Sequence, residues 1–151
     1  MEEFRSADDI LDFAIASEQE AMDFYTNLAK HTKSKAMKEV FLQFAKEEKG
    51  HKTRLIKIKK DQSFEFREKK VTDLKIADYL VEIEPQPDMP YREALIVAMK
   101  KEKAAFKLYT NLANIAENST LQNIFLSLAQ EEAKHKLRFE IEYDEHVLSE
   151  N

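Results

Sequence analysis

The stretch EEKGHKTRL, residues 47–55, is repeated with few changes as EEAKHKLRF, residues 131–139, which lie 84 positions further along the chain. Both copies have the pattern Glu-Glu-x-x-His-Lys-x-Arg. A glutamate and a histidine three positions apart lie on the same face of an α-helix. A charged run on a helix surface gives no reason for its histidine to recur in register, whereas a site built from two equivalent halves does.

The similarity between the two halves extends beyond this motif. Residues 18–29 are identical to residues 102–113 at seven of twelve positions, and residues 41–54 are identical to residues 125–138 at eight of fourteen. Unrelated segments of these lengths and of average composition would share about one identity each. We therefore interpret the chain as a duplicated helical hairpin.

Apolar periodicity and capping residues predict four long helices, at about residues 6–30, 34–60, 91–117 and 119–148. Ser6 is the expected N-cap of the first helix, and Ser119 is that of the last, with Gln122 as its capping-box partner. The hairpins 6–60 and 91–148 are joined by a crossover at 61–90, in which VTDLKIADYLVEI allows at most a short helix. We expect an all-α four-helix bundle that forms one domain over residues 1–151.

The overall composition excludes several classes of function. The 151 residues include no cysteine, which rules out disulfides, zinc–thiolate sites, iron–sulfur clusters and thiol catalysis. The net charge of −5 shows no basic stripe, so nucleic-acid binding is not expected. The start of the sequence is acidic, and no run of about 18 apolar residues could cross a membrane. We expect a cytoplasmic protein that does not bind membranes.

The apolar stripe of each predicted helix is interrupted by a glutamate, and in two helices also by a histidine one turn later. These residues are Glu18, Glu48, His51, Glu102, Glu132 and His135. Burying one unpaired carboxylate costs several kcal/mol, and clustering four raises the pKa of each. Two divalent cations would balance the four negative charges. Such a set of inward-facing ligands is the one found in ferritin-like di-iron and di-manganese bundles, although zinc also accepts these ligand types.

Other polar residues near these stripes have less certain roles. Tyr25 and Tyr109 lie seven positions after Glu18 and Glu102, and they are either core aromatics or hydrogen-bond donors to the ligand carboxylates. Glu47 and Glu131 lie just off the stripe, so we expect them at the solvated rim or behind the ligands. Three further positions are expected to be unrelated to the site, namely His31 and His146 on the surface and the outward-facing Gly50, while Glu142 has no assigned role.

The motif E-x-x-A-x-x-x-Y followed by E-E-x-x-H, present twice, resembles that of the rubrerythrin branch of the ferritin-like proteins. The resemblance covers about residues 6–148 and implies that the six stripe residues bind two iron ions, with Glu48 and Glu132 bridging. Rubrerythrins usually add a rubredoxin-type iron site with four cysteines, which this sequence lacks. They also typically carry a further glutamate where this sequence has Ala105, whose equivalent in the first half is Ala21.

The resemblance implies a di-iron oxidoreductase that reduces hydrogen peroxide or dioxygen. Two Fe2+ ions would supply the electrons and end as oxo-bridged Fe3+, with manganese or zinc as substitutes, and a separate protein would donate electrons. We expect a homodimer. Two alternatives remain open: iron handling, as a ferroxidase, store or buffer, and a non-catalytic bundle that metal merely stabilises.

Overall fold

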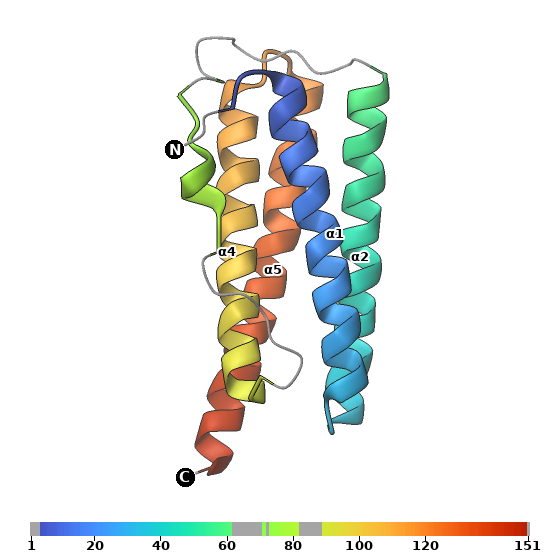
Figure 1. The fold of residues 1–151 in the computed structure, drawn as a ribbon, viewed down its shortest axis with the longest axis vertical. Helices are drawn as coiled ribbons and strands as arrows, with labels where there is room; N and C mark the ends of the chain where they lie inside the picture. The colour runs from blue at the N-terminus through green and yellow to red at the C-terminus, as the bar shows by residue number, and fades with distance from the viewer. Residues whose placement is uncertain (1–3, 62–70, 72, 82–88, 151) are drawn as a thin grey trace.

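The computed structural model describes residues 4–61, 71, 73–81 and 89–150, with the backbone alone for residues 147–150. Four long α-helices run side by side (Figure 1). They are α1 (Ala7–His31), α2 (Lys35–Lys60), α4 (Tyr91–Ile115) and α5 (Ser119–Glu150), and a 3-10 helix, η1 (Ile76–Tyr79), lies in the crossover. The predicted all-α bundle of two hairpins with a long crossover is confirmed.

The helices pack mainly within their own hairpins. The helix α1 packs closely along α2, and α4 packs closely along α5, whereas α1 and α4 approach each other at few points. The last turns of α5 extend beyond the ends of the other helices (Figure 1). Within the described part of the chain, no helix is both long and apolar enough to cross a membrane.

The ends of the helices follow from local capping. The Oγ of Ser6 accepts a hydrogen bond from the backbone N–H of Asp9 at 3.2 Å, as predicted for the start of α1. The prediction for α5 was wrong in detail, because Oδ1 of Asn118, not the Ser119 hydroxyl, accepts from the N–H of Leu121 at 2.7 Å. Asparagine is as good an N-cap as serine, so the helix begins at the expected residue with a different cap.

The hydrophobic core consists of two clusters, one toward each end of the bundle. The first is built around residues such as Leu11, Leu55, Leu112 and Phe125, and the second around Tyr25, Phe41, Leu95 and Phe139. Along every long helix, the buried glutamate lies where one cluster gives way to the other. The acids therefore occupy the middle of the bundle, with apolar side chains on both sides.

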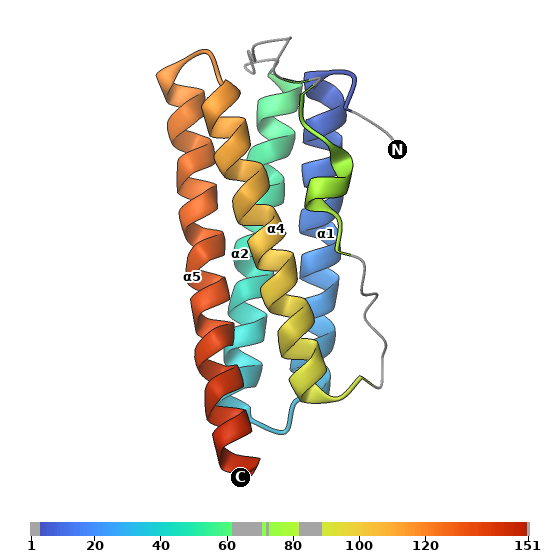
Figure 2. The same ribbon diagram turned by 90° about the vertical axis from the view of Figure 1, so that its left-hand side faces the viewer.

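The 3-10 helix η1 is a short helical segment in the crossover, which the sequence had allowed, and residues 62–70, 72 and 82–88 of the crossover lie outside the described part. The hydroxyl of Tyr79 accepts a hydrogen bond from Nδ2 of Asn111 in α4 at 2.8 Å. The Tyr79 ring also packs on Phe4 and Phe13, with ring centroids 6.2 and 6.5 Å away. These contacts hold η1 over the side of the bundle that α1 and α4 form (Figure 2).

Candidate metal centre

Four helices place acids and histidines at the middle of the bundle. The helices α1 and α4 each contribute one glutamate, while α2 and α5 each contribute a glutamate and a histidine one turn apart. Each of these residues is at most 2% exposed: Glu18, Glu48, His51, Glu102, Glu132 and His135. Among the residues with described side chains, no other acid or histidine is buried. The structure thus brings together all six residues that the sequence singled out.

The six residues form two overlapping groups of four. One group is Glu18, Glu48, His51 and Glu132, and the other is Glu48, Glu102, Glu132 and His135. Within each group the candidate ligand atoms all lie within 4.8 Å of one another. Glu48 and Glu132 belong to both groups, which is the position that a pair of bridging carboxylates would occupy.

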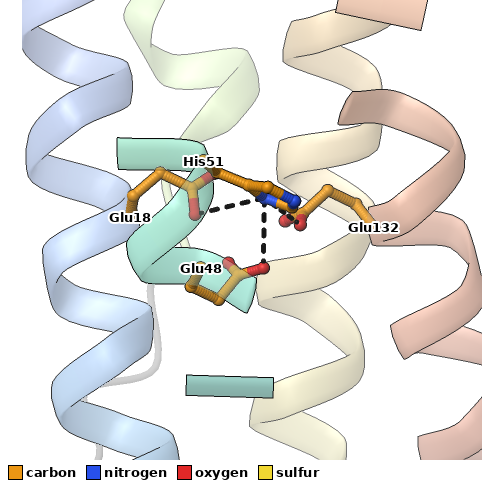
Figure 3. A group of neighbouring side chains, drawn as sticks. All are labelled: Glu18, Glu48, His51 and Glu132. Carbon is orange, nitrogen blue, oxygen red and sulfur yellow. Dashed lines mark ion pairs between the residues drawn. The ribbon is translucent and has the colours of Figure 1, made fainter. Parts of the chain in front are cut away.

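Both histidines face the carboxylates through Nδ1. Nδ1 of His51 lies 3.0 Å from Glu132 Oε1, 3.4 Å from Glu48 Oε1 and 3.6 Å from Glu18 Oε2 (Figure 3). Nδ1 of His135 lies 3.3 Å from Glu48 Oε1 and 3.6 Å from Glu102 Oε1. The two imidazole rings are nearly parallel, with centroids 6.4 Å apart. The carboxylate oxygens therefore lie close to two imidazole nitrogens, one from each half of the chain.

Each of the six residues has at least one buried polar atom that lacks a hydrogen bond of acceptable geometry. On the inward-facing side these atoms are Glu18 Oε2, Glu48 Oε1, His51 Nδ1, Glu102 Oε2, Glu132 Oε1 and His135 Nδ1. A buried polar atom without a partner costs about 1–3 kcal/mol, and more if it is charged. Metal coordination would satisfy all of them at once, so the residues present fit a pair of metal ions.

The electrostatics of the cluster also favour added positive charge. Burial raises the pKa of Glu48 well above its ordinary value, and the charges of the three other glutamates raise it further. Burial and the charges of neighbouring carboxylates raise the pKa of Glu132 in the same way. Without metal, these carboxyl groups are held toward their protonated form. Two divalent cations would replace those protons and balance four carboxylates.

Burial and carboxylate charge act in opposite directions on the histidines. Burial alone would lower the pKa of His51, but its pairing with Glu18 and the nearby carboxylate charges outweigh burial and raise it to about 9. Burial likewise opposes ionisation of His135, and the nearby Glu102 and Glu48 raise its pKa to about 10. In the metal-free cluster the nearby carboxylates therefore favour the protonated form of both imidazoles.

Tyr25 and Tyr109 connect the hairpins through the ligand carboxylates. The hydroxyl of Tyr25 in α1 donates to Glu102 in α4, and the hydroxyl of Tyr109 in α4 donates to Glu18 in α1. Both rings are at most 1% exposed, and burial raises the pKa of each hydroxyl well above its ordinary value. The sequence left open whether these tyrosines were only core aromatics, and the structure shows that their hydroxyls orient the acids.

Glu47 and Glu131 contact the outer edges of the histidines. Oε2 of Glu131 lies 3.2 Å from Nε2 of His51, and Oε2 of Glu47 lies 3.4 Å from Nε2 of His135. Both carboxylates are about one-third exposed, at 34%. They are therefore not simply solvated. Glu131 makes a hydrogen bond with Nε2 of His51, whereas Glu47 approaches Nε2 of His135 only as a charged neighbour, because that nitrogen lacks a hydrogen bond of acceptable geometry. The repetition of the double Glu-Glu in both halves was the sequence signal for this role.

The residues expected to be unrelated to the site lie away from it. His31 is exposed, and its Nδ1 lies 2.9 Å from the carbonyl oxygen of Asn27. His146 is partly buried rather than fully on the surface, because its ring packs edge-on against Tyr91 with centroids 5.1 Å apart. Glu142, which had no assigned role, accepts a hydrogen bond from the Tyr91 hydroxyl at 3.1 Å.

A cavity of about 700 Å³ reaches this centre from the side that faces η1. Its inner wall includes Glu18, Glu48, Glu102, Glu132 and Tyr109, and it continues outward between α1 and α4. Ala105, which stands where the resemblance to rubrerythrins places a further glutamate, also lines it, as does its equivalent Ala21. The cavity was not predicted from the sequence, because it depends on the distance between the two hairpins.

A four-helix bundle with inward-facing glutamates and two Glu-x-x-His pairs belongs to the class of ferritin-like di-iron and di-manganese carboxylate proteins. The sequence profile of the rubrerythrin family matches residues 9–85 and 93–151. The chain therefore belongs to the rubrerythrin family.

Two solved structures resemble the whole bundle. A candidate ferritin-like diiron-carboxylate protein from Thermotoga maritima is 24% identical, with a TM-score of 0.77 over 97% of this chain and 99% of that chain. A hypothetical protein from Pyrococcus furiosus is 27% identical, with a TM-score of 0.71 over 89% of this chain and 86% of that one. No curated protein matches the sequence significantly. The resemblances confirm the ferritin-like fold.

Proposed function

We propose that this protein is a di-iron oxidoreductase that reduces hydrogen peroxide or dioxygen with electrons from a separate donor protein. The observation that carries the proposal is the pair of overlapping four-residue groups that share Glu48 and Glu132. Two shared carboxylates would hold two metal ions close together, which suits a reaction that takes two electrons. The proposed ligands are Glu18, Glu48, His51, Glu102, Glu132 and His135.

The choice of iron rests on the type of ligand and on the family. Carboxylate and imidazole ligands without sulfur suit iron or manganese and also accept zinc. A bound pair of iron ions would supply the two electrons that convert hydrogen peroxide and two protons into two water molecules. Because the sequence contains no cysteine, it has no rubredoxin-type site to deliver those electrons. The donor is therefore proposed to be another protein.

The chain itself would position the metal ions and control access to them. The hydroxyls of Tyr25 and Tyr109 hold one oxygen of Glu102 and of Glu18, respectively, which leaves the other oxygen of each free to face the centre. Glu131 holds the His51 imidazole from behind through a hydrogen bond, and Glu47 lies behind the His135 imidazole. The core clusters exclude water from both ends, and the cavity between α1 and α4 gives a small oxidant a path from the side.

The test begins with metal content and continues with a single turnover. Protein loaded with Fe2+ without oxygen is mixed with hydrogen peroxide or with dioxygen, and its absorption spectrum is followed by stopped flow. We expect rapid oxidation with two metals per chain. The Glu48→Ala variant should not bind the pair, whereas the control Glu39→Ala, at an exposed position of α2, should behave as the parent.

Two results would contradict this proposal. One is Fe2+-loaded protein that neither oxidant oxidises faster than free Fe2+ under the same conditions. The other is a large shell that holds many irons per chain by native mass and elemental analysis, which would indicate storage instead. Metal bound in full stoichiometry by both Glu48→Ala and His135→Ala would show that the proposed site is wrong.

A further inference from the structure

The cavity beside the metal centre is much larger than a peroxide or dioxygen molecule requires. Its volume of about 700 Å³ lies within the roughly 300–1,000 Å³ range of sites for organic ligands. A water molecule takes up about 30 Å³ in the liquid, and hydrogen peroxide is only slightly larger. Access of an oxidant alone would therefore need a small part of this space.

Small side chains from both helices line the space. Ala16 and Ala21 on α1 and Ala104 and Ala105 on α4 belong to its lining, and none of them is long enough to fill it. The lining also includes the apolar Phe13, Phe24 and Leu108. At the outer end, η1 and the residues after it add an exposed Leu80. An elongated apolar molecule would find a contact surface along the whole length of the cavity.

The depth of the cavity argues against a protein surface as its occupant. Its lining includes Tyr109, Glu102 and Glu132 at the inner end, and these residues are each only 1% exposed, so the space ends against them. A flat face of a partner helix could cover the mouth but could not fill the space behind it. A molecule of a few rings, or a chain of similar width, could.

The charges along the cavity favour a neutral occupant. Near the outer end, Glu20 and Asp23 are balanced in part by Lys101, whose Nζ lies 5.7 Å from the Phe24 ring centroid. At the inner end, the four carboxylates are balanced by two metal ions or, without metal, by protons and the nearby imidazoles, so an ionic group would be buried there without a partner. The mixed signs at the mouth give no preference for a charged end group, and the interior disfavours an ionic one.

We propose that the cavity between α1 and α4 is a binding site for an uncharged, mostly apolar organic molecule, whose inner end lies beside the metal-binding carboxylates. This goes beyond the reduction of a small oxidant. It does not depend on that chemistry, because binding can be measured without any turnover. The organic molecule would bind beside the metal centre, in addition to the small oxidant.

The test uses two fluorescent probes with related ring systems. N-phenyl-1-naphthylamine is neutral, whereas 8-anilino-1-naphthalenesulfonate carries a sulfonate, and the fluorescence of both increases in apolar surroundings. The full chain, as purified and after metal removal, is titrated with each probe. We expect saturable binding of the neutral probe that is about tenfold tighter or more than that of the anionic probe, equivalent to about 1.4 kcal/mol.

Variants that fill the cavity locate the binding. Ala104→Leu and, separately, Ala16→Leu should weaken binding of the neutral probe by about tenfold or more, because the new side chain occupies the space of a probe ring. Ala16 is exposed, so its replacement should not disturb folding. The matched control is Ala36→Leu, on an exposed face of α2 outside the cavity lining, and it should leave binding unchanged.

Three outcomes would overturn the proposal. They are the absence of saturable binding, tighter binding of the anionic probe, and equal binding by the cavity variants and the control, with helix content by circular dichroism unchanged in all. A native mass that shows a second copy blocking the site, with probe binding only after dissociation, would also overturn it. None of these outcomes bears on whether peroxide oxidises the Fe2+-loaded protein, so the two proposals fail separately.

Discussion

The His51 side and the His135 side of the centre offer the same donor atoms but have different supports. Behind His51, Glu131 is also contacted by Nη1 of Arg54 at 3.2 Å. Behind His135, no arginine among the described residues contacts Glu47, because Arg138, the counterpart of Arg54, instead contacts Met37 Sδ and Glu142. The duplication has kept every residue that would touch a metal ion, and it has kept both arginines, but the contacts of the two arginines differ.

The rings of the two histidines also have different neighbours. Phe44 stacks on His135, with centroids 3.9 Å apart and planes inclined by 21°. The equivalent position in the second half is Leu128, which cannot stack on His51. One imidazole is thus held by an aromatic face and a lone carboxylate, and the other by a carboxylate–guanidinium pair. The two metal positions should bind with similar chemistry but with different affinity.

The largest expected effect comes from the residues that both sides share. Glu48→Ala removes a carboxylate from both four-residue groups and should abolish binding of both metals. This loss of metal affinity exceeds the roughly 10- to 100-fold loss that is typical when a residue behind a ligand is replaced. Glu102→Ala leaves the group around His51 intact and should lose only one metal. Elemental analysis after dialysis measures both. Equal losses from the two variants would contradict the shared role of Glu48.

Removing the metals should make stability depend strongly on pH. The pKa values of His51 and His135, about 9 and about 10 in the fold, lie above the ordinary 6.5, so the metal-free folded protein holds protons that the unfolded chain releases. The stabilisation is complete below about pH 6.5 and is lost as pH rises through about 9 to 10.

The raised pKa values of Glu48 and Glu132 also make the metal-free fold less stable as pH rises. This loss begins at a lower pH than that of the histidines, because the ordinary pKa of a glutamate is 4.5. We expect the melting temperature of metal-free protein to fall by on the order of 5 °C or more between pH 6 and pH 9.5. Loaded protein should melt higher and vary less, because the metals replace the protons. Parallel pH profiles for the two forms in thermal scans would refute this.

The outer carboxylates should distinguish the two sides. Glu131→Gln should weaken metal binding on the His51 side by about 10- to 100-fold. Arg54→Gln should have a smaller effect in the same direction, since it frees Glu131 without removing it. Arg138→Gln, its equivalent, should leave metal affinity unchanged because it does not contact Glu47. Calorimetric titration with Mn2+ or Zn2+ resolves these steps, and an equal effect of the two arginine variants would show that the asymmetry has no influence on binding.

Exchanging the stacked residue should make the metal affinities of the two sides more alike. Phe44→Leu gives the His135 side the residue found in the other half, and its loss of stacking should cost about 0.5–1.5 kcal/mol of folding stability. We expect the two metal-binding steps to become less separated in the same titration. Leu128→Phe provides the reciprocal test. If the two metal-binding steps remain equally separated in Phe44→Leu, the difference in affinity between the two sides would be due to Arg54 alone.

The smallest expected effect concerns a position where the halves differ without touching the centre. Gly50 is exposed, and a Cβ placed there would meet nothing within 4 Å, which confirms that it faces outward. Its equivalent is Lys134. Gly50→Ala should raise the free energy of unfolding by about 1 kcal/mol through helix propensity, while Lys134→Gly should lower it by a similar amount. Urea denaturation measures both, with metal content unchanged; a destabilised Gly50→Ala would contradict the outward position.

The fold and the inner residues of the site could be predicted because they follow from short-range patterns. Helical periodicity places Glu48 and His51 on one buried face, and the repeat does the same for Glu132 and His135. Sequence spacing could not show that Glu131 faces His51 rather than a residue of its own helix, since that contact depends on how α5 lies against α2.

The remaining features depend on tertiary distances or on competition between near-equal groups. The cavity results from the spacing of α1 and α4, which no local pattern encodes. The choice of Asn118 over Ser119 as N-cap lies within the one-residue uncertainty of helix ends. Sequence reasoning was therefore reliable for faces of helices and incomplete for contacts between hairpins.

The crossed tyrosine bonds have a consequence for how the halves relate. Tyr25 of the first hairpin donates to Glu102 of the second, and Tyr109 of the second donates to Glu18 of the first. The two bonds join equivalent positions of the repeat in opposite directions. Such reciprocity is the geometry of an isologous two-fold interface, here covalently joined within one chain. Neither hairpin contains the partner of its own acid. The metal centre therefore belongs to the interface, and any event that separates the hairpins would dismantle it from both sides at once.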